Sequence, residues 1–145
     1  MKFEQENIMK ISVCLDKNNG MMFFGKRQSQ DVRQRERFLE LIGSNKLFMT
    51  SYSAKLFDAL PNIIVNEMPQ NIASDEDYYF VEDGAYDIDK CSQIILYKWN
   101  RKYPADRFFD VDLLKQSFRK VKSTEFEGRS HEKITEEIYE RKNNT

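Results

Sequence analysis

Two carboxylates, Glu82 and Asp83, stand where a strand predicted for Tyr78–Glu82 would lead into a short helix, "GAYDIDKC". In an α/β sheet this turn is a common place for a phosphate group, which binds backbone N–H groups at a helix N-terminus. Such a turn usually carries glycine. At about 5 Å and an effective dielectric constant near 20, each carboxylate–phosphate pair would repel by roughly 3 kcal/mol. We therefore expect Asp83 to cap its own helix and to satisfy those N–H groups itself.

A single histidine, His131, limits the metal chemistry open to the chain. Zinc hydrolases that use several histidine ligands cannot be built from it, and we expect no metal site. Ser130, His131 and Glu132 are adjacent, so their side chains diverge, whereas a catalytic triad is assembled from distant positions. We therefore interpret His131 as a residue of a hairpin turn.

Two cysteines, Cys14 and Cys91, lie far apart in apolar segments without metal-ligand partners nearby. This favours buried, reduced thiols and a cytoplasmic location. The start, "MKFEQENIMK", lacks the apolar stretch of a signal peptide, and no apolar run reaches the ~20 residues that span a bilayer. We expect residues 1–8 to form a loose extension and residues 9–145 to form one domain.

Basic residues crowd one stretch beside Phe23 and Phe24, namely Lys26, Arg27, Arg33, Arg35 and Arg37. This stretch could contact RNA phosphates, or it could be a solvated helix face with local ion pairs. The chain holds 23 Lys+Arg against 24 Asp+Glu. The second interpretation is therefore favoured, and neither a nucleic-acid nor a membrane partner is expected. Tyr97, Trp99 and Tyr103 alternate with basic residues, but we expect Trp99 to close the core.

Hydrophobic periodicity divides the chain into short elements. Strands are predicted at Lys10–Leu15, Lys46–Thr50, Asn62–Glu67, Tyr78–Glu82, Gln93–Trp99 and Phe118–Glu127. One helix is predicted from its N-cap Asp31 to Gly43, and a second over "SYSAKLFDAL", which Pro61 ends. "NNGMMFFGKRQSQ" and "MPQNIASDED" are predicted as loops, and "RFFDVD" as a short strand or an extended turn.

The last element, Ile134–Tyr139, is ambiguous. The four-residue spacing of Ile134 and Ile138 favours a helix, whereas a strand would follow the "GRS" turn and close the sheet. The nearly continuous apolar run Gln93–Trp99 indicates a strand that is buried on both faces. Together the elements predict an α/β fold, with a mostly parallel sheet flanked by helices and a C-terminal antiparallel hairpin.

The order of these elements resembles dihydrofolate reductase. "ISVCLDKNNGM" is similar to that family's first strand and loop, and "NKLFMTSYSAKLFDALPNIIVNE" to its second strand, helix and third strand. "SQIILYKWNRKYPADRFFD" is the best local match, with an Asp-x-x-Phe turn at its end. "RSHEKITEEIYERK" resembles the closing strand of the family, which implies a strand for Ile134–Tyr139. The likeness spans about residues 10–142, with a shortfall between Glu67 and Tyr78, where the family has another strand and helix.

The resemblance implies a catalytic position at the start of the first helix, where the family places a carboxylate that protonates a pterin. Asp31 is the candidate for this proton donor. Counting back from Asn45 and Lys46 puts Arg35 near that position instead, and Asp31 would then serve only as the helix N-cap.

The resemblance also implies a cofactor-binding turn. The family holds cofactor phosphates with a basic residue and a hydroxyl at its second helix, and this chain has Thr50, Ser51 and Ser53 there without the positive charge. Only Gly84 is left of the family's diglycine. Since Glu82 and Asp83 disfavour NADPH, no cofactor is expected.

The signatures "YKWNRKYPAD" and "SHEKIT" resemble a small set of bacterial proteins of this length that carry the label ribonuclease Z. That label conflicts with the chemistry, because ribonuclease Z resembles metallo-β-lactamases and needs a cluster of histidines.

Three functions follow from these observations. The first is a dihydrofolate reductase-like protein without the usual NADPH-phosphate residues, which binds a small molecule or a protein. The second is an NAD(P)H-dependent reductase of a pterin-like substrate, with Asp31 as proton donor. The third is an RNA-binding or RNA-processing protein. The segment "NIIVNE" could form an exposed sheet edge, which would favour a homodimer.

Overall fold

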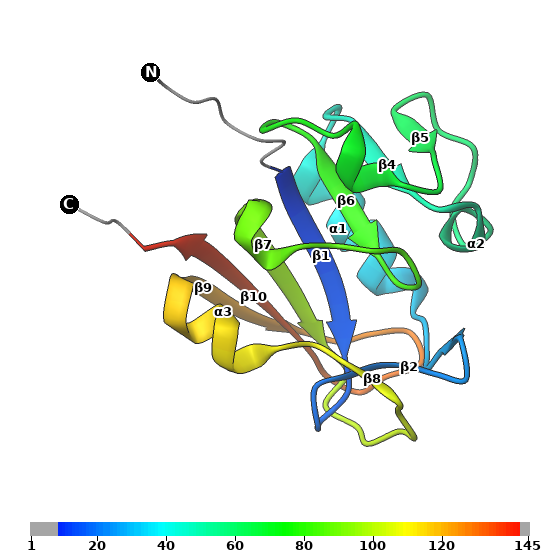
Figure 1. Cartoon of the computed structure of the whole chain (residues 1–145). Helices are drawn as coiled ribbons and strands as arrows, with labels where there is room; N and C mark the ends of the chain where they lie inside the picture. The colour runs from blue at the N-terminus through cyan, green and yellow to red at the C-terminus, as the bar shows by residue number, and fades with distance from the viewer. Residues whose placement is uncertain (1–8, 143–145) are drawn as a thin grey trace.

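β1 (Met9–Leu15) runs through the middle of a seven-stranded sheet, as the computed structural model of the chain shows (Figure 1). The structure describes residues 9–142, and the predicted extension at residues 1–8 lies outside them. The strand order is β5-β4-β6-β1-β7-β10-β9. The remaining bounds are β4 Leu47–Met49, β5 Ile63–Val65, β6 Tyr78–Val81, β7 Cys91–Lys98, β9 Phe118–Phe126 and β10 Ile134–Arg141.

The pairing directions follow the expected pattern. β5, β4, β6, β1 and β7 are parallel neighbours, and β10 and β9 pair antiparallel at the far side. The predicted mostly parallel sheet with an antiparallel finish is therefore confirmed. The segment Ile134–Tyr139 is a strand, so the helical alternative is wrong there: pairing on both sides, with β7 and β9, outweighs its helix propensity.

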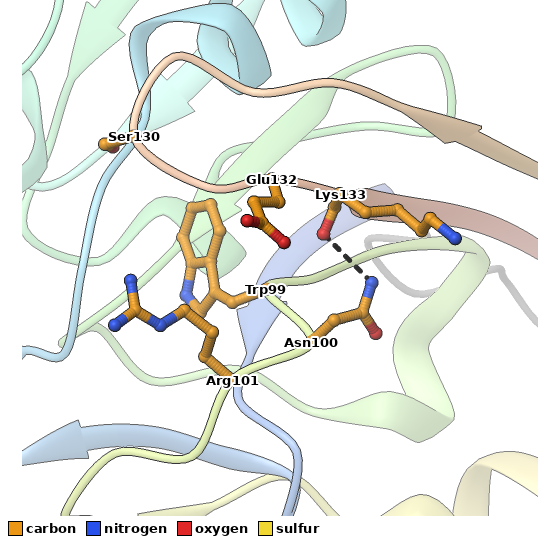
Figure 2. A pocket seen from close by; sticks show the side chains of 6 residues that line it. All are labelled: Trp99, Asn100, Arg101, Ser130, Glu132 and Lys133. Atoms are coloured by element: carbon orange, nitrogen blue, oxygen red, sulfur yellow. Dashed lines mark hydrogen bonds between the residues drawn. The ribbon is translucent and has the colours of Figure 1, made fainter.

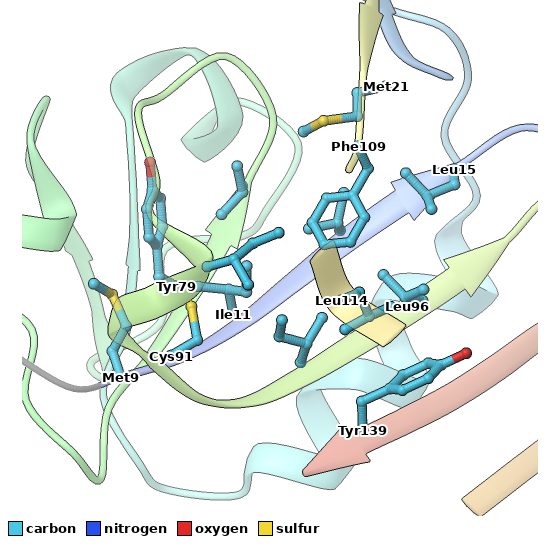
Figure 3. Close-up of a cluster of buried hydrophobic side chains, with 14 of the residues drawn as sticks. Met9, Ile11, Leu15, Met21, Tyr79, Cys91, Leu96, Phe109, Leu114 and Tyr139 are labelled. Atoms are coloured by element: carbon cyan, nitrogen blue, oxygen red, sulfur yellow. The ribbon is translucent and has the colours of Figure 1, made fainter. Parts of the chain in front are cut away.

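Apolar side chains cover both faces of the central strands. On one face, Met9, Ile11 and Leu15 of β1 pack with Leu96 of β7 and Leu114, as Figure 3 shows. On the other face, the core contains Phe38, Phe80, Ile95, Tyr97 and Trp99. Because successive residues of β7 enter the two cores alternately, its continuous apolar run is buried on both sides as predicted.

α1 (Val32–Ile42) covers one face and presents Phe38 and Ile42 to the sheet. Asp31 is its N-cap and accepts hydrogen bonds from the N–H groups of Arg33 and Gln34. Gly43 follows the last turn with φ = 59°, a left-handed conformation that glycine adopts at little cost. Both predicted ends of this helix are confirmed.

α2 is shorter than predicted and covers only Ser51–Ala54. The N–H groups of Leu56 and Phe57 bond to residues three positions back, which tightens the turn and ends the helix before Pro61. Phe57 then packs edge-on against Phe80 of β6, with ring centroids 5.3 Å apart. Tertiary packing therefore outweighs the helix propensity of the rest of "SYSAKLFDAL".

A second sheet was not predicted. β2 (Gly20–Phe23), β3 (Lys26–Arg27) and β8 (Arg107–Phe108) form three antiparallel strands where a loop was expected at residues 18–30. Phe24 and Gly25 join β2 to β3 with φ of 52° and 72°, as a tight hairpin requires. Met21 and Met22 anchor this sheet in the core.

The chain between β6 and β7, and after β8, also differs from prediction. "GAYDIDKC" contains only a single 3-10 turn, Ile88–Lys90, and a similar turn, Pro69–Asn71, lies in the predicted loop before β6. α3 (Val111–Ser117) was missed, although Asp110 caps it through the N–H of Leu113 at 2.9 Å. Its only fully buried residue is Leu114, which gives a weak periodic signal. α1 and α3 lie on opposite faces of the sheet (Figure 1).

None of the helices formed by residues 9–142 is long and apolar enough to cross a membrane.

Candidate functional site

The carboxyl ends of β4 and β6 lie side by side, because these strands are parallel neighbours. Thr50 and Ser53 follow β4, and Glu82 and Asp83 follow β6. Thr50 Oγ1 donates a hydrogen bond to Asp83 Oδ1 at 2.7 Å, and Ser53 Oγ donates one to Glu82 Oε1 at 2.7 Å. Of the three hydroxyls implied at the cofactor-binding turn, those of Thr50 and Ser53 are therefore bound to carboxylates of the same chain.

Arg27 supplies a positive charge that the sequence did not show at this turn. Its Nε and Nη2 donate to the two oxygens of Glu82 at 2.9 Å and 2.8 Å. Its guanidinium also lies 4.3 Å from the ring centroid of Tyr52. The hydrogen bond to Glu82 raises the pKa of Arg27, and burial lowers that pKa by less. Sequence reasoning missed this pairing because it placed Arg27 in a loop, 55 residues from its partner.

The start of α2 is also occupied by a carboxylate. The Ser51 N–H donates to Glu67 Oε2 at 3.1 Å, and the Ser53 N–H donates to Thr50 Oγ1 at 3.4 Å. Glu67 was not recognised from the sequence. Three carboxylates of the chain therefore take the hydrogen bonds that a phosphate group would need here.

Asp83 does not cap a helix, so that expectation is wrong. The turn after it begins at Asp87, whose side chain accepts the N–H of Asp89 at 3.0 Å. Asp83 instead bonds to Thr50 across the two strands, because four residues separate it from the first turn that forms.

Gly84 lies against the chain's own side chains. A Cβ at this position would stand 2.2 Å from Tyr79 Oη and 3.0 Å from Thr50 Cγ2. Arg107 fixes the same turn by donating to the carbonyl of Glu82 at 2.7 Å and to that of Gly84 at 2.9 Å. The absence of a side chain is therefore explained by internal packing.

Asp31 is buried, and its two oxygens are fully engaged. Oδ1 accepts the N–H groups of Arg33 and Arg129, and Oδ2 accepts those of Ser130 and His131 Nδ1 at 2.8 Å and 2.9 Å. Burial alone would raise the pKa of this carboxyl, but these hydrogen bonds outweigh it and hold the pKa well below its ordinary range. Asp31 is therefore ionised at neutral pH, the wrong state for a proton donor.

A cavity of about 170 Å³ lies between α1 and the segment that follows α2. Its apolar wall includes Leu39, Leu56 and Phe57, and Arg35 reaches it from α1. The Arg35 guanidinium donates to Gln30 Oε1, and no carboxylate among residues 9–142 forms an ion pair with it. Burial lowers the pKa of Arg35, which marks a partly desolvated cation. Arg35, which counting from Asn45 and Lys46 put near the family's catalytic position, therefore lines a cleft of this structure.

The five basic residues of the predicted patch do not form one surface. Arg33 pairs locally with Glu36 at 3.6 Å. Arg37 binds Glu136 of β10 through two hydrogen bonds at 3.0 Å and 3.1 Å. With Arg27 bound to Glu82, only Lys26 of the five is exposed without a side-chain partner in the described chain.

The two cysteines are free, and their surroundings favour the protonated thiol. Burial raises the pKa of Cys91 to about 12 and that of Cys14 well above its ordinary value. Residues 9–142 contain no group of three histidine, cysteine, aspartate or glutamate side chains placed to hold a metal ion.

A second cavity, of about 430 Å³, lies between the loop after β7 and the loop before β10 (Figure 2). Asn100 closes one side of it, with Nδ2 donating to the carbonyl of Lys133 at 3.0 Å. Trp99 forms the floor with 2% of its surface exposed, which confirms its predicted place in the core. Its indole stacks on His131 at a centroid distance of 4.4 Å.

Comparison with known proteins supports the fold. No protein-family model matches the chain, and no curated protein matches it by sequence. Among solved structures, it is similar to dihydrofolate reductase from Enterococcus faecalis complexed with NADP(H) and RAB-propyl, at 14% identity and a TM-score of 0.66. The match covers 94% of this chain and 97% of the other. The chain therefore has a dihydrofolate reductase-like fold, as its element order predicted.

Proposed function

We propose that this protein is a binding module with the dihydrofolate reductase fold, which takes a small anionic molecule beside Arg35 and does not bind NADPH as the reductases do. The observation that carries this proposal is the internal occupation of the turn after β6. Glu67, Glu82 and Asp83 accept hydrogen bonds from Ser51, Ser53 and Thr50, the residues that the fold family would direct at phosphate.

A diphosphate could enter this turn only by displacing those carboxylates. A hydrogen bond to a charged group contributes roughly 1.5–3 kcal/mol, and three would be exchanged at once. Arg27 offers no compensation, because both of its donors toward the site already bind Glu82. The fold is thus retained while its anion site is filled from within.

The cavity beside Arg35 has the properties of a ligand site. It combines apolar walls from Leu39, Leu56 and Phe57 with one guanidinium that has no carboxylate partner among residues 9–142. A guanidinium in this state gains most from a carboxylate or phosphate ligand. Glu36 and Asp58 at the rim would repel a second negative charge, which favours a ligand with one anionic group and a flat apolar body.

The reductase remains a second candidate, because the similar solved structure holds NADP(H). In that case Glu82 and Asp83 would have to leave their hydroxyl partners when the cofactor binds, and Asp31 would have to be reprotonated.

Calorimetric titration separates these candidates. The wild-type protein is titrated in parallel with NADPH and with pteroate, a flat molecule with a single carboxylate. We expect no heat of binding for NADPH up to about 1 mM, which corresponds to a binding free energy weaker than about 4 kcal/mol. For the double variant Glu82→Gln, Asp83→Asn we expect measurable NADPH binding, because two repulsive charges are removed and Arg27 is released.

The Arg35 cavity is tested with matched variants of one helix. Arg35→Gln should weaken the binding of pteroate by at least about tenfold, and the exposed Arg33→Gln should leave it unchanged. Micromolar NADPH binding by the wild type would contradict the proposal and would favour the reductase function instead. If Arg35→Gln and Arg33→Gln changed the binding equally, Arg35 would not be a ligand-binding residue.

The same proposal includes a reducing compartment such as the cytoplasm, which suits two free thiols. It also includes self-association through β5, which is an edge strand of three residues with Val65 half exposed. We expect the molecular mass in solution to rise with protein concentration. In Val65→Lys we expect it to stay at the value of the monomer.

A further inference from the structure

Three loops that are far apart in the sequence meet in front of α1. They contribute Ser29 and Asp31, Trp99 and Tyr103, and His131. His131 Nδ1 lies 2.9 Å from Asp31 Oδ2, and His131 Nε2 lies 3.0 Å from Ser29 Oγ. A carboxylate, an imidazole and a hydroxyl are thus joined in one line, through the two opposite nitrogens of the ring.

Asp31 sets the orientation of this line. The carboxylate is ionised and accepts backbone N–H groups from Arg33, Arg129 and Ser130, so it has a fixed orientation. It can only accept, and the His131 proton therefore resides on Nδ1. Nε2 is left as an acceptor that faces the Ser29 hydroxyl. The stacked Trp99 ring holds the plane of the imidazole.

The exposure of the three groups is graded. His131 and Asp31 are buried, with 1% and 0% of their side chains exposed. Ser29 is only partly buried, so it is the most exposed of the three residues. A nucleophile at the surface, with its base and the orienting carboxylate behind it, is the arrangement that activates a serine.

A cavity of about 270 Å³ lies beside the segment that holds Ser29, and Ser29 itself is not one of its lining residues. It is lined by Phe23, Phe24, Lys26, Arg27, Gln28, Tyr103 and Pro104. Gln28 precedes Ser29 in the chain, and the Tyr103 hydroxyl lies 3.4 Å from Ser29 Oγ and 3.1 Å from His131 Nε2. The aromatic walls suit an apolar group, and the Tyr103 hydroxyl is a donor in reach of an oxygen bound at the serine.

We propose that Ser29 is a nucleophile activated by His131, and that it cleaves carboxylic esters whose acyl group is small and apolar. This activity goes beyond the binding role proposed above and uses a different part of the molecule. Ser29 and His131 are the catalytic residues, and Asp31 is a positioning residue that acts through His131.

The chemistry needs only water as a co-reactant. Ser29 Oγ forms a bond to the carbonyl carbon while its proton passes to His131 Nε2, and the carbonyl oxygen takes the negative charge beside the Tyr103 hydroxyl. The C–O bond to the alcohol then breaks, and the alcohol leaves with the proton from His131. Water attacks the acyl-serine, gives its proton to the same nitrogen, and releases the acid as Ser29 regains its hydrogen.

A fluorophosphonate probe tests the nucleophile directly. The full chain is incubated with the probe, and the modified residue is located by mass spectrometry of its peptides. We expect one adduct, on Ser29, together with hydrolysis of p-nitrophenyl butyrate. Ser29→Ala should abolish both signals, and His131→Gln should lower both rates by at least about 100-fold.

Ser123→Ala is the matched control, because Ser123 is an exposed serine of β9 that has no contact with Ser29, Asp31 or His131. It should retain labelling and hydrolysis. Thermal unfolding of each variant shows whether it is folded, and the single-atom change Ser29→Ala keeps the test valid if His131→Gln does not fold. Absence of an adduct on Ser29, or equal labelling in folded His131→Gln, would overturn the proposal.

Discussion

Asp31→Asn replaces one oxygen of a buried carboxylate by an NH₂ group. It tests how much the contacts of Asp31 with the loop around His131 contribute to the free energy of unfolding. The amide has the shape of the carboxylate, but one of its two acceptor oxygens becomes an NH₂ donor. In the orientation that keeps the helix cap intact, this NH₂ faces the Ser130 N–H at 2.8 Å and the Nδ1 proton of His131 at 2.9 Å. The new NH₂ group and these two N–H groups are all hydrogen-bond donors, so none of them has an acceptor in this buried region.

The expected cost follows from these two contacts. A buried polar group that loses its partner costs about 1–3 kcal/mol, so the two groups together give roughly 2–6 kcal/mol. His131 can relieve one clash by moving its proton to Nε2, which places the value at the lower end of that range. At about 2–4 °C per kcal/mol for a chain of this size, the melting temperature should fall by roughly 5–15 °C.

The contribution of Asp31 to the free energy of unfolding depends on pH, and its sign follows from the direction of the pKa shift. The pKa of Asp31 is lower in the folded protein than its unfolded value of about 3.9. Its contribution to the free energy of unfolding is therefore fully present above the unfolded pKa. It is lost as pH falls from there toward the folded pKa, by up to about 1.4 kcal/mol per pH unit. The asparagine has no such contribution, so the gap between wild type and variant should narrow as the pH falls from about 6 to about 3.

Urea unfolding at several pH values across this interval, followed by tryptophan fluorescence, measures both quantities. Trp99 is a suitable reporter because it stacks on His131. Asp75→Asn is the matched control, since Asp75 is exposed and has no hydrogen bond to another described residue. Equal midpoints for Asp31→Asn and wild type near neutral pH, or a gap that widens with acid, would show that the Asp31 carboxylate does not stabilise the fold through these contacts.

Three further predictions concern the turn after β6 and the core. Glu82→Gln leaves the partly buried Arg27 without its charged partner and should lower the free energy of unfolding by about 1–3 kcal/mol in urea. Gly84→Ala should cost about 1–3 kcal/mol because its Cβ meets the Tyr79 hydroxyl at 2.2 Å. Adding Tyr79→Phe should recover part of that loss, and no recovery would point to another clash. With a pKa of about 12 and no exposed surface, Cys91 should resist iodoacetamide at mildly alkaline pH in the folded protein and react in urea; rapid labelling of the folded chain would contradict its burial.

The sheet was largely predictable because its signals are local. The apolar runs of β1, β6 and β7 mark the strands, and the caps at Asp31 and Gly43 mark α1. The errors fall where the deciding interactions are distant. β2 and β3 form because Met21 and Met22 are buried against the main sheet, and α2 ends early because Phe57 packs on Phe80.

The candidate sites show the same division. The position of Glu82 and Asp83 at a strand end was readable, since strand ends follow from hydrophobic runs. Their partners were not, because Arg27 lies 55 residues from Glu82 and Thr50 lies 33 residues from Asp83. His131 was recognised as a turn residue, but its bond to Asp31 spans 100 residues and no spacing rule reaches that far.

The place of β10 in the sheet has a consequence for synthesis on the ribosome. β10 follows every other strand in the sequence, yet it lies between β7 and β9 and not at an edge. Until Ile134–Arg141 emerges from the ribosome, one edge of β7 has no paired strand. Until His131 emerges, the Asp31 carboxylate lacks its hydrogen bond to the imidazole. The strands therefore cannot be added to the sheet in the order in which they are synthesised. The nascent chain exposes the apolar edge of β7 until Ile134–Arg141 has been translated.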